Sequence, residues 1–327
     1  MAVFTELSDD EVKQLLQNFD LGIFISLTPI ASGIENTNYF LDTSKGRWVL
    51  TVFERLTPEQ LPFYLQLCDH LFNKGCLVAH PVRTKQGHLF SFVHGKPFSI
   101  ANRLHGENVE SMGYAECCSM GTELGKLHLA ALDFTMKQPN LRGLDWCAKT
   151  IPALKSKVPS SLYEILASEL EHQQAVASSP AYSELVVSAC HCDLFRNNAL
   201  IANPGTPMAS VAGVFDFYFA GFSPQLFDLA VTMNDWCIDT HTGKFLMPLA
   251  QAFIERYNKV RPLTQADKLL WRDMLRAAAL RFWTSRLYDW YCPREASLLK
   301  PHDPTHFQRV LLDRRICDLP WPEDPSL

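Results

Sequence analysis

The sequence predicts an α+β protein of two lobes: an antiparallel sheet with one inserted helix in residues 1–101, and a mainly helical lobe in residues 102–327. Two observations carry this prediction. Short apolar and β-branched runs bounded by turn signals fill the first hundred positions, whereas long helical periodicities fill most of the rest. A third observation is a polar loop between two short apolar runs, at residues 191–198, which indicates a functional site inside the helical lobe.

Length, charge and composition restrict the class of protein. The 327 residues are enough for two lobes and a sizeable core, and the net charge of −5 is spread over interspersed acidic and basic residues. The chain has neither a basic stripe for nucleic acid nor a polybasic segment or a run of about 18 apolar residues for a membrane. Residues 1–10 are unlike a signal peptide, and the ten cysteines form no Cys-x-x-Cys motif. We therefore expect a cytoplasmic monomer or homodimer with reduced cysteines, whose partner is a small molecule and neither nucleic acid nor a membrane.

Periodicity predicts the elements of the first lobe. Apolar residues at helical spacing indicate helices, and β-branched runs bounded by Gly indicate strands. In chain order, the expected elements are a helix at 11–19, a turn opening into a strand within 30–41, a strand at 48–53, a helix at 58–74 that ends at Gly75, and strands near 77–78, 89–93 and 97–101.

The turn before the first of these strands has two interpretations. It contains Ser32 and Gly33, and the backbone N–H groups of such a turn can face a bound phosphate. A single Gly is equally compatible with an ordinary β-hairpin. The sequence leaves both interpretations open.

The second lobe is predicted to be built from helices. His128 lies on an apolar face of the first one, where a histidine is more often a core residue than a functional one. The last helix is dense in Leu, Ala and aromatic residues, so much of it is expected to be buried. The expected helices span residues 114–132, 160–178, 226–237, 244–259 and 265–291.

The polar loop lies between predicted strands. An apolar run at residues 185–190 precedes it, and a hairpin with an Asn-Pro-Gly turn follows. This order brings Asp216, at the end of the hairpin, back beside Asp193 and Asn198 of the loop. Two carboxylates and an amide oxygen are suitable ligands for magnesium. The sequence therefore predicts a magnesium and phosphate site.

The spacing His-x-Asp-x-x-x-x-Asn, followed later by Asp, is that of the kinase catalytic loop. Phosphoryl transfer needs a carboxylate that orients the attacking hydroxyl and accepts its proton, and oxygen ligands for the Mg²⁺ that neutralises phosphate charge. The alternative is a polar loop whose Asp and Asn only cap turns. Cys192, inside the loop, is interpreted as a small packing residue and not as a nucleophile.

Residues 191–200 are similar to the catalytic loop of the aminoglycoside/choline phosphotransferase superfamily, small-molecule kinases with a bilobal protein-kinase-like fold. Residues 216–220 and 226–237, which end in Asn-Asp-Trp-Cys, closely resemble type II homoserine kinases, as do residues 34–39 and 300–304. The resemblance extends over nearly the whole chain. It implies a kinase that uses ATP and Mg²⁺ to phosphorylate the side-chain hydroxyl of L-homoserine, on the way to threonine.

The resemblance also implies roles for individual residues. Asp193 would be the catalytic base, His191 would hold the loop, and Asp228 would support it from behind. Asn198 and Asp216 would bind Mg²⁺. The first lobe would cover the nucleotide, with contacts from Ser32, Gly33, Asn36, Asn38, Thr51, Ala101 and Arg103.

One position departs from the superfamily pattern. Most members place Lys or Arg where this chain has Thr51, and that cation pairs with the nucleotide phosphates. A hydroxyl group cannot supply positive charge. Two candidates for the missing cation are Arg196, in the catalytic loop, and Arg55.

L-Homoserine is a zwitterion, so its site should offer an acid to the ammonium group and a cation to the carboxylate. Asn234, Asp235, Arg281 and Arg286 are the candidates. Two alternatives remain open. One is a kinase for another small alcohol, such as choline, an aminoglycoside or methylthioribose, which would also use Asp193, Asn198 and Asp216. The other is a non-catalytic nucleotide-binding pseudokinase, which would explain Thr51.

Overall fold

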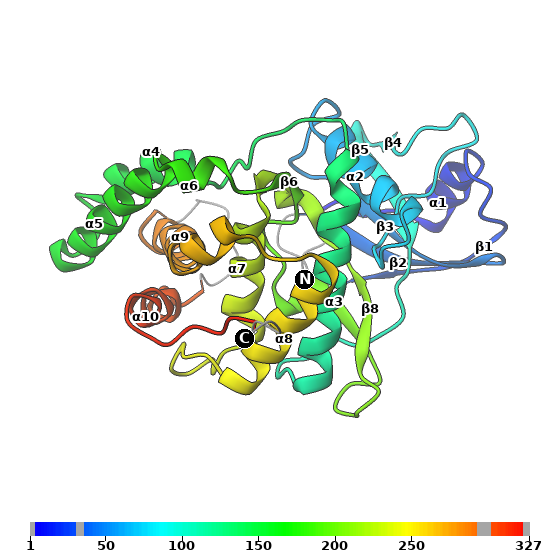
Figure 1. Ribbon diagram of the computed structural model, residues 1–327. Coiled ribbons are helices and arrows are strands. Elements are labelled where there is room, and N and C mark those ends of the chain that lie inside the picture. Colours follow the sequence, from blue (N-terminus) through cyan, green and yellow to red (C-terminus); the bar gives the residue numbers. More distant parts are fainter. Residues whose placement is uncertain (1–3, 31–35, 293–301, 323–327) are drawn as a thin grey trace. The chain divides into compact units, whose positions relative to one another are not determined.

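The computed structural model describes residues 4–30, 36–292 and 302–322 (Figure 1). The chain divides into two compact units, Met1–His105 and Gly106–Leu327, whereas the sequence analysis placed the boundary after residue 101. Each unit buries apolar side chains of its own.

The first unit is an antiparallel five-stranded sheet, the architecture predicted for the first lobe. The strand order is β1-β2-β3-β5-β4, and every neighbouring pair is antiparallel. In chain order the elements are α1 (Asp9–Leu16), β1 (Phe24–Pro29), β2 (Thr37–Thr43), β3 (Gly46–Val52), α2 (Leu61–Asn73), β4 (Ser91–Val93) and β5 (Lys96–Asn102).

Alternating side chains give this sheet one apolar face. β2 and β3 form a hairpin in which Thr43 pairs with Gly46, and the φ of Gly46 is +152°, a value that favours glycine. The apolar face packs with α1 into the core of the unit, because successive residues of a strand point to opposite sides. This core includes Val12, Leu16, Tyr39, Leu41, Leu50, Val52, Phe98 and Ile100.

Helix α2 begins at Leu61, later than the predicted residue 58. The preceding residues form a turn, in which the side chain of Gln60 accepts a hydrogen bond from the backbone N–H of Thr57 at 3.0 Å. At the other end, Gly75 follows the helix with φ +85°, the left-handed conformation that commonly ends helices.

The strand expected near residues 77–78 is not formed. The chain instead meets β5 through an isolated bridge between Pro81 and Ala101, with backbone hydrogen bonds to β5 on both sides. Proline has no N–H group and cannot continue a regular ladder, which explains why the pairing stays this short.

The second unit is mainly helical, and all the helices predicted for it are present. Helices α4, α6 and α10 were not predicted. None of the described helices is long and apolar enough to cross a membrane. In chain order the elements are α3 (Tyr114–Ala130), η1 (Ala131–Asp133), α4 (Leu144–Leu154), α5 (Ser160–Ala177), α6 (Pro180–Ser183), β6 (Val187–Cys190), η2 (Arg196–Asn198), β7 (Ala199–Ala202), β8 (Ser210–Val214), η3 (Phe217–Phe219), β9 (Gly221–Pro224), α7 (Gln225–Trp236), α8 (Met247–Val260), α9 (Gln265–Tyr291) and α10 (Thr305–Arg314).

Helices α3 and α8 lie side by side (Figure 1) because α3 presents two glycines to α8. A Cβ atom on Gly121 would lie 2.3 Å from the carbonyl oxygen of Phe253. A Cβ atom on Gly125 would lie 2.9 Å from Cβ of Val260. The missing side chains therefore permit the close approach of the two helices.

Helix α7 is buried on nearly all sides, with α9 and the strands β6 and β9 packed against it (Figure 1). An apolar run on all faces is expected of such a helix. Its few polar residues therefore need partners inside the protein. Two of them, Asp228 and Asp235, hold the polar loop described below.

The polar loop is framed by two small antiparallel sheets. β6 pairs with β9, and β7 pairs with β8. Residues 191–198 connect β6 to β7, and residues 215–220 connect β8 to β9. Both connections therefore pass between the same two sheets, which brings the loop and the segment around Asp216 together.

Candidate active site

Asp228 on α7 anchors the polar loop through its backbone. Its Oδ2 accepts a hydrogen bond from the N–H of His191 at 3.0 Å, and its Oδ1 accepts one from the N–H of Cys192 at 2.7 Å. Cys192 has φ +63°, a left-handed conformation that side chains rarely adopt without such support. Both Cys192 and Asp228 are fully buried, so Cys192 has the packing role that the sequence indicates.

His128 on α3 holds Asp228 from the other side. Its Nε2 lies 3.1 Å from Oδ2 of Asp228, and its Nδ1 lies 2.7 Å from the hydroxyl of Tyr257. Burial alone would raise the pKa of Asp228, but the hydrogen bonds from His128 and the loop lower it below its ordinary value. His128 is 1% exposed, as expected of a core residue, but the sequence did not indicate that it supports the loop.

His191 ties the loop to the segment that carries Asp216. Its Nε2 donates to the carbonyl oxygen of Phe215 at 3.0 Å, and its Nδ1 accepts from the N–H of Asp193 at 3.3 Å. This assignment of the ring nitrogens follows from their partners and requires a neutral imidazole. Burial lowers the pKa of His191, which agrees with that state.

Asp193 projects from the loop with a side chain that is 19% exposed. Burial raises its pKa to about 7, against the opposing effect of Arg281, and neighbouring carboxylates add to the rise. A general base is most effective when its pKa lies near the working pH. Asp193 therefore has the environment of a group that can accept a proton.

Asn198 and Asp216 provide oxygen atoms suited to a magnesium ion. The Nδ2 group of Asn198 donates to the carbonyl oxygen of Asp193 at 2.8 Å, which leaves its Oδ1 as the side-chain atom suited to a metal ion. Its backbone carbonyl accepts from the N–H of Phe215 at 3.0 Å, next to Asp216. Asp216 has φ +65°, and its carboxylate completes a donor set of hard oxygen atoms. These residues fit Mg²⁺.

Arg196 anchors the loop to the end of α7. Its backbone N–H and Nε donate to Oδ2 of Asp235 at 2.8 Å and 3.0 Å, and Nη1 donates to the carbonyl oxygen of Glu110 at 2.6 Å. Nη2 donates to the carbonyl oxygen of Asp235. We expected Arg196 to supply charge for a phosphate and Asp235 to bind an ammonium group. In the structure Arg196 and Asp235 instead form an ion pair with each other, because both lie in the same unit, where α7 places Asp235 next to the loop.

Asn234 does not reach the loop. It is 1% exposed, and its Nδ2 donates to the carbonyl oxygen of Leu275 at 2.9 Å. Its Oδ1 accepts from Nε of Arg314, also at 2.9 Å. The amide is therefore part of the packing of α7 against α9 and α10, and the role in substrate binding that we expected has no support in this geometry.

Arg281 on α9, by contrast, lies beside Asp193. Its Nη2 is 3.8 Å from Oδ1 of Asp193, and its side chain is 6% exposed. The guanidinium group lies over the ring of Phe282, 3.8 Å from the centroid, and 5.5 Å from that of Phe219. Arg286, further along α9, lies over the ring of Phe307, 4.4 Å from its centroid.

Asn38, Thr51 and Ala101, three of the residues assigned to the nucleotide, lie in the first unit on the sheet face opposite its core. Thr51 donates a hydrogen bond to Oδ1 of Asn38, its cross-strand partner, at 2.8 Å. Nδ2 of Asn38 contacts the carbonyl oxygen of Asn36 at 3.5 Å. Ala101 pairs with Val49 on β3. The guanidinium of Arg103 lies 3.8 Å from the ring of Phe40, while Ser32 and Gly33 fall outside the described residues.

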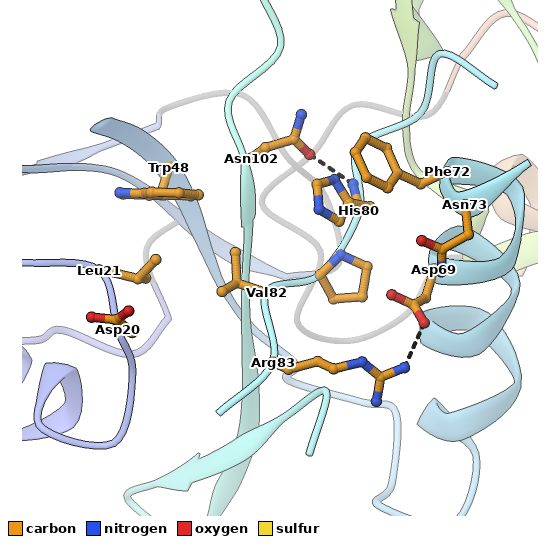
Figure 2. Close-up of a pocket in the computed structure, with 11 residues that line it drawn as sticks. Asp20, Leu21, Trp48, Asp69, Phe72, Asn73, His80, Val82, Arg83 and Asn102 are labelled. Carbon is orange, nitrogen blue, oxygen red and sulfur yellow. Dashed lines mark hydrogen bonds and ion pairs between the residues drawn. The ribbon is translucent and has the colours of Figure 1, made fainter. Parts of the chain in front are cut away.

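A surface pocket in the first unit is separate from this face (Figure 2). Arg83 and Asp69 form an ion pair at 2.5 Å on one side of it, and the rings of Phe72 and His80 stack 3.5 Å apart. The N–H of His80 donates to Oδ1 of Asn102 at 2.8 Å. The polar and aromatic groups of the pocket wall therefore have partners within the wall itself, and we assign the pocket no ligand.

Comparison with known proteins identifies the family of this chain. Residues 26–263 match the model of the phosphotransferase enzyme family. A homoserine kinase of Burkholderia ambifaria (strain MC40-6) is 48% identical over 317 residues, which cover 96% of each chain. The homoserine kinase of Paraburkholderia phymatum is 47% identical over 96% of this chain and 98% of its own.

Solved structures with the same fold have more distant sequences. The amicoumacin kinase hAmiN, in complex with AMP-PNP, Ca²⁺ and Ami, has a TM-score of 0.67 and 14% identity over 94% of this chain and 93% of its own. Choline kinase LicA from Streptococcus pneumoniae has a TM-score of 0.64 and 13% identity, over 94% and 98%. Fold and loop together define a small-molecule phosphotransferase with a protein-kinase-like architecture. The chain belongs to the phosphotransferase enzyme family, in the branch that contains these homoserine kinases.

Proposed function

We propose that this protein transfers the γ-phosphoryl group of ATP to the side-chain hydroxyl of L-homoserine, giving O-phospho-L-homoserine and ADP on the way to threonine. The observation that carries the proposal is the combination of two facts. Asp193, Asn198 and Asp216 stand on one anchored pair of loops, in a chain that is 48% identical to a homoserine kinase over 96% of its length.

Each residue of the loop would have one task. Asp193 orients the hydroxyl group of the acceptor and takes its proton as the oxygen attacks phosphorus. Asn198, through Oδ1, and Asp216 would hold the Mg²⁺ that, when bound, neutralises charge on the β- and γ-phosphates. His191 and Asp228 touch no reactant; they keep the backbone of the loop in position.

The nucleotide contacts are proposed for the polar face of the first unit. Asn38 and Thr51 share a hydrogen bond there, and a hydroxyl or amide can bind a phosphate oxygen without supplying charge. Asn36, Ala101 and Arg103 complete this set, together with Ser32 and Gly33. With Thr51 in place of a cation, we expect the charge on the phosphates to be balanced mainly by the metal ion.

The test is ADP release from Mg·ATP across an acceptor panel of L-homoserine, L-serine, choline, methylthioribose and kanamycin. Turnover with L-homoserine, with a phosphomonoester product seen by ³¹P NMR, is the expected result. Turnover with a different member would keep the roles of the three loop residues and overturn the assignment of the acceptor. Binding of ATP without turnover on any acceptor would instead support a non-catalytic nucleotide-binding protein.

A further inference from the structure

We propose that Arg281 binds the carboxylate of the acceptor and that Arg286 reinforces it, so that α9 selects hydroxy acids over hydroxy amines. The inference rests on the proposed function and adds the recognition of one chemical group to it. Its starting point is a guanidinium group that is buried but poorly partnered.

Arg281 has five N–H donors inside a side chain that is 6% exposed. Among the described residues, the structure records no hydrogen bond for them. The acidic atom recorded beside it is Oδ1 of Asp193, at 3.8 Å, beyond hydrogen-bond distance. Other arginines of the unit donate hydrogen bonds to an acid; Arg276, for example, donates to both oxygens of Glu169 at 2.9 Å and 2.8 Å. Buried charges are normally paired and hydrogen-bonded, so Arg281, which has Asp193 nearby but no recorded hydrogen bond, can take a further anion.

The surroundings of Arg281 define the side from which that anion can come. The guanidinium plane lies on Phe282, 3.8 Å from its centroid, and Phe282 stacks on Phe307 at 5.2 Å. Arg286 lies on Phe307, so two guanidinium groups flank one aromatic cluster. Phe195, from the catalytic loop, packs on the same two rings at 4.4 Å and 5.7 Å. The cluster therefore joins the two cations directly to the loop that carries the base.

The chemistry of the acceptor matches this arrangement. In L-homoserine three carbon atoms separate the hydroxyl oxygen from the carbon of the carboxylate, a span on the order of 5 Å by standard bond lengths. A molecule whose hydroxyl group contacts Asp193 can therefore place its carboxylate on Arg281, which lies next to that base. Arginine is the preferred partner of carboxylates because its fork of donors binds both oxygens at once.

The same pair of arginines would disfavour a different class of acceptor. Choline and aminoglycosides are cations, and they would meet two like charges beside the base. Specificity commonly includes such a repulsive element. A carboxylate, in contrast, would relieve the mutual repulsion of Arg281 and Arg286 and supply the further anion. Carboxylates also lie near Asp193, but the two cations on α9 favour an anionic or zwitterionic alcohol on their side of it.

The experiment compares three alcohols that differ by one charged group. L-Homoserine has both groups, 3-amino-1-propanol lacks the carboxylate, and 4-hydroxybutanoate lacks the ammonium group. We expect the wild-type protein to prefer L-homoserine over 3-amino-1-propanol by roughly 10²-fold or more in kcat/KM, because loss of the carboxylate leaves a buried cation without a hydrogen-bonded anion. Arg281→Met should lower kcat/KM for L-homoserine and 4-hydroxybutanoate by a similar factor and leave 3-amino-1-propanol within a few-fold.

Two further variants make the comparison decisive. Arg281→Lys keeps the positive charge, so it should retain part of the preference for acceptors with a carboxylate, and the remaining loss should appear mostly in KM. This variant replaces Arg281→Met in the test if Arg281→Met does not fold. Arg272→Gln, on the same helix, removes a guanidinium that donates to the carbonyl oxygens of Arg314 and Cys317. It should leave the ratio between acceptors unchanged.

The outcomes separate this inference from the proposed function. If wild-type protein phosphorylates L-homoserine but Arg281→Met and Arg281→Lys slow all three alcohols equally, Arg281 acts on the phosphoryl group or the base, and the inference is overturned. If wild-type protein prefers 3-amino-1-propanol, the inference is also overturned. If it uses no member of this set but phosphorylates choline or kanamycin, the proposed function itself fails.

Discussion

The carboxylate of Asp228 and the imidazole of His128 lie 3.1 Å apart and join helices α7 and α3. Each of the two residues is only 1% exposed. The same carboxylate receives the N–H groups of His191 and Cys192. The position of the catalytic loop therefore depends on a contact between two helices that lie behind it. Neither residue needs to touch a reactant for its loss to reduce the rate.

Asp228→Asn tests this dependence. An amide offers a single acceptor oxygen, so one backbone N–H of the loop would lose its partner in a buried site. We expect the free energy of unfolding to fall by about 3 kcal/mol or more, and kcat to fall with it, while ATP binding changes less. Urea denaturation and steady-state kinetics measure the two effects.

Asp239→Asn is the matched control for that variant. Asp239 also accepts two backbone N–H groups, from His241 and Thr242, but it does so in an exposed loop. Its substitution should have a smaller effect on unfolding and none on kcat. Equal effects of the two variants would contradict the role assigned to Asp228.

Asp193→Asn removes the proposed base and keeps the size of the side chain. We expect kcat to fall roughly 10²-fold or more, because the amide cannot accept the proton of the acceptor hydroxyl. The affinity for Mg·ATP, measured by calorimetry, should stay within a few-fold of wild type. Near-full turnover would show that another group takes the proton.

Glu169 should control stability in acid. It is fully buried and accepts hydrogen bonds from Arg276 and Arg315. Burial alone would raise the pKa of Glu169, but these partners lower it below its ordinary value of 4.5. A carboxyl group whose pKa is lower in the folded than in the unfolded protein stabilises the fold at pH values above its unfolded-state pKa. This stabilisation is lost as the pH falls through the folded-state pKa. The wild-type protein should therefore lose this contribution as the pH drops below about 4.5.

Glu169→Gln tests the sign of that effect. At pH 7 the variant should be less stable by about 3 kcal/mol or more, because two arginines lose their buried partner. The difference from wild type should shrink as the pH is lowered, since both proteins then present a neutral group. Thermal unfolding at several pH values measures it, and a difference that is constant with pH would refute the assignment.

Two glycines of α3 should differ in their tolerance of alanine. In Gly121→Ala the new methyl group meets the backbone oxygen of Phe253 at 2.3 Å, and the helices would have to separate. In Gly125→Ala it meets Cβ of Val260 at 2.9 Å and the backbone oxygen of Tyr257 at 3.3 Å, a smaller overlap that a smaller shift of α8 would relieve. We expect the free energy of unfolding to fall by about 3 kcal/mol or more in Gly121→Ala and by about 1 kcal/mol in Gly125→Ala. The reverse order would mean that α3 does not pack on α8 as described.

Local pattern by itself determined much of this protein. Turn residues and alternating apolar runs predicted the antiparallel sheet of the first unit except for its edge strand β1, and helical periodicity predicted most helices of the second. The spacing from His191 to Asn198 predicted the loop with its Asp, because strand, loop and hairpin are determined by residues close in sequence. The short contact at Pro81 was missed, since only its partner Ala101 on β5 defines it.

Partners distant in sequence were decided only by the tertiary structure. Arg196 could serve a phosphate or an internal acid, and α7 brings it Asp235, which lies thirty-nine residues along the chain. Asn234 likewise accepts a hydrogen bond from Arg314 of α10, a helix that was not predicted from the sequence. Arg281 differs because packing buries it beside Asp193 without giving it a hydrogen bond among the described residues. A polar side chain shows in the sequence what it is able to bind, but the fold determines which of its possible partners is within reach.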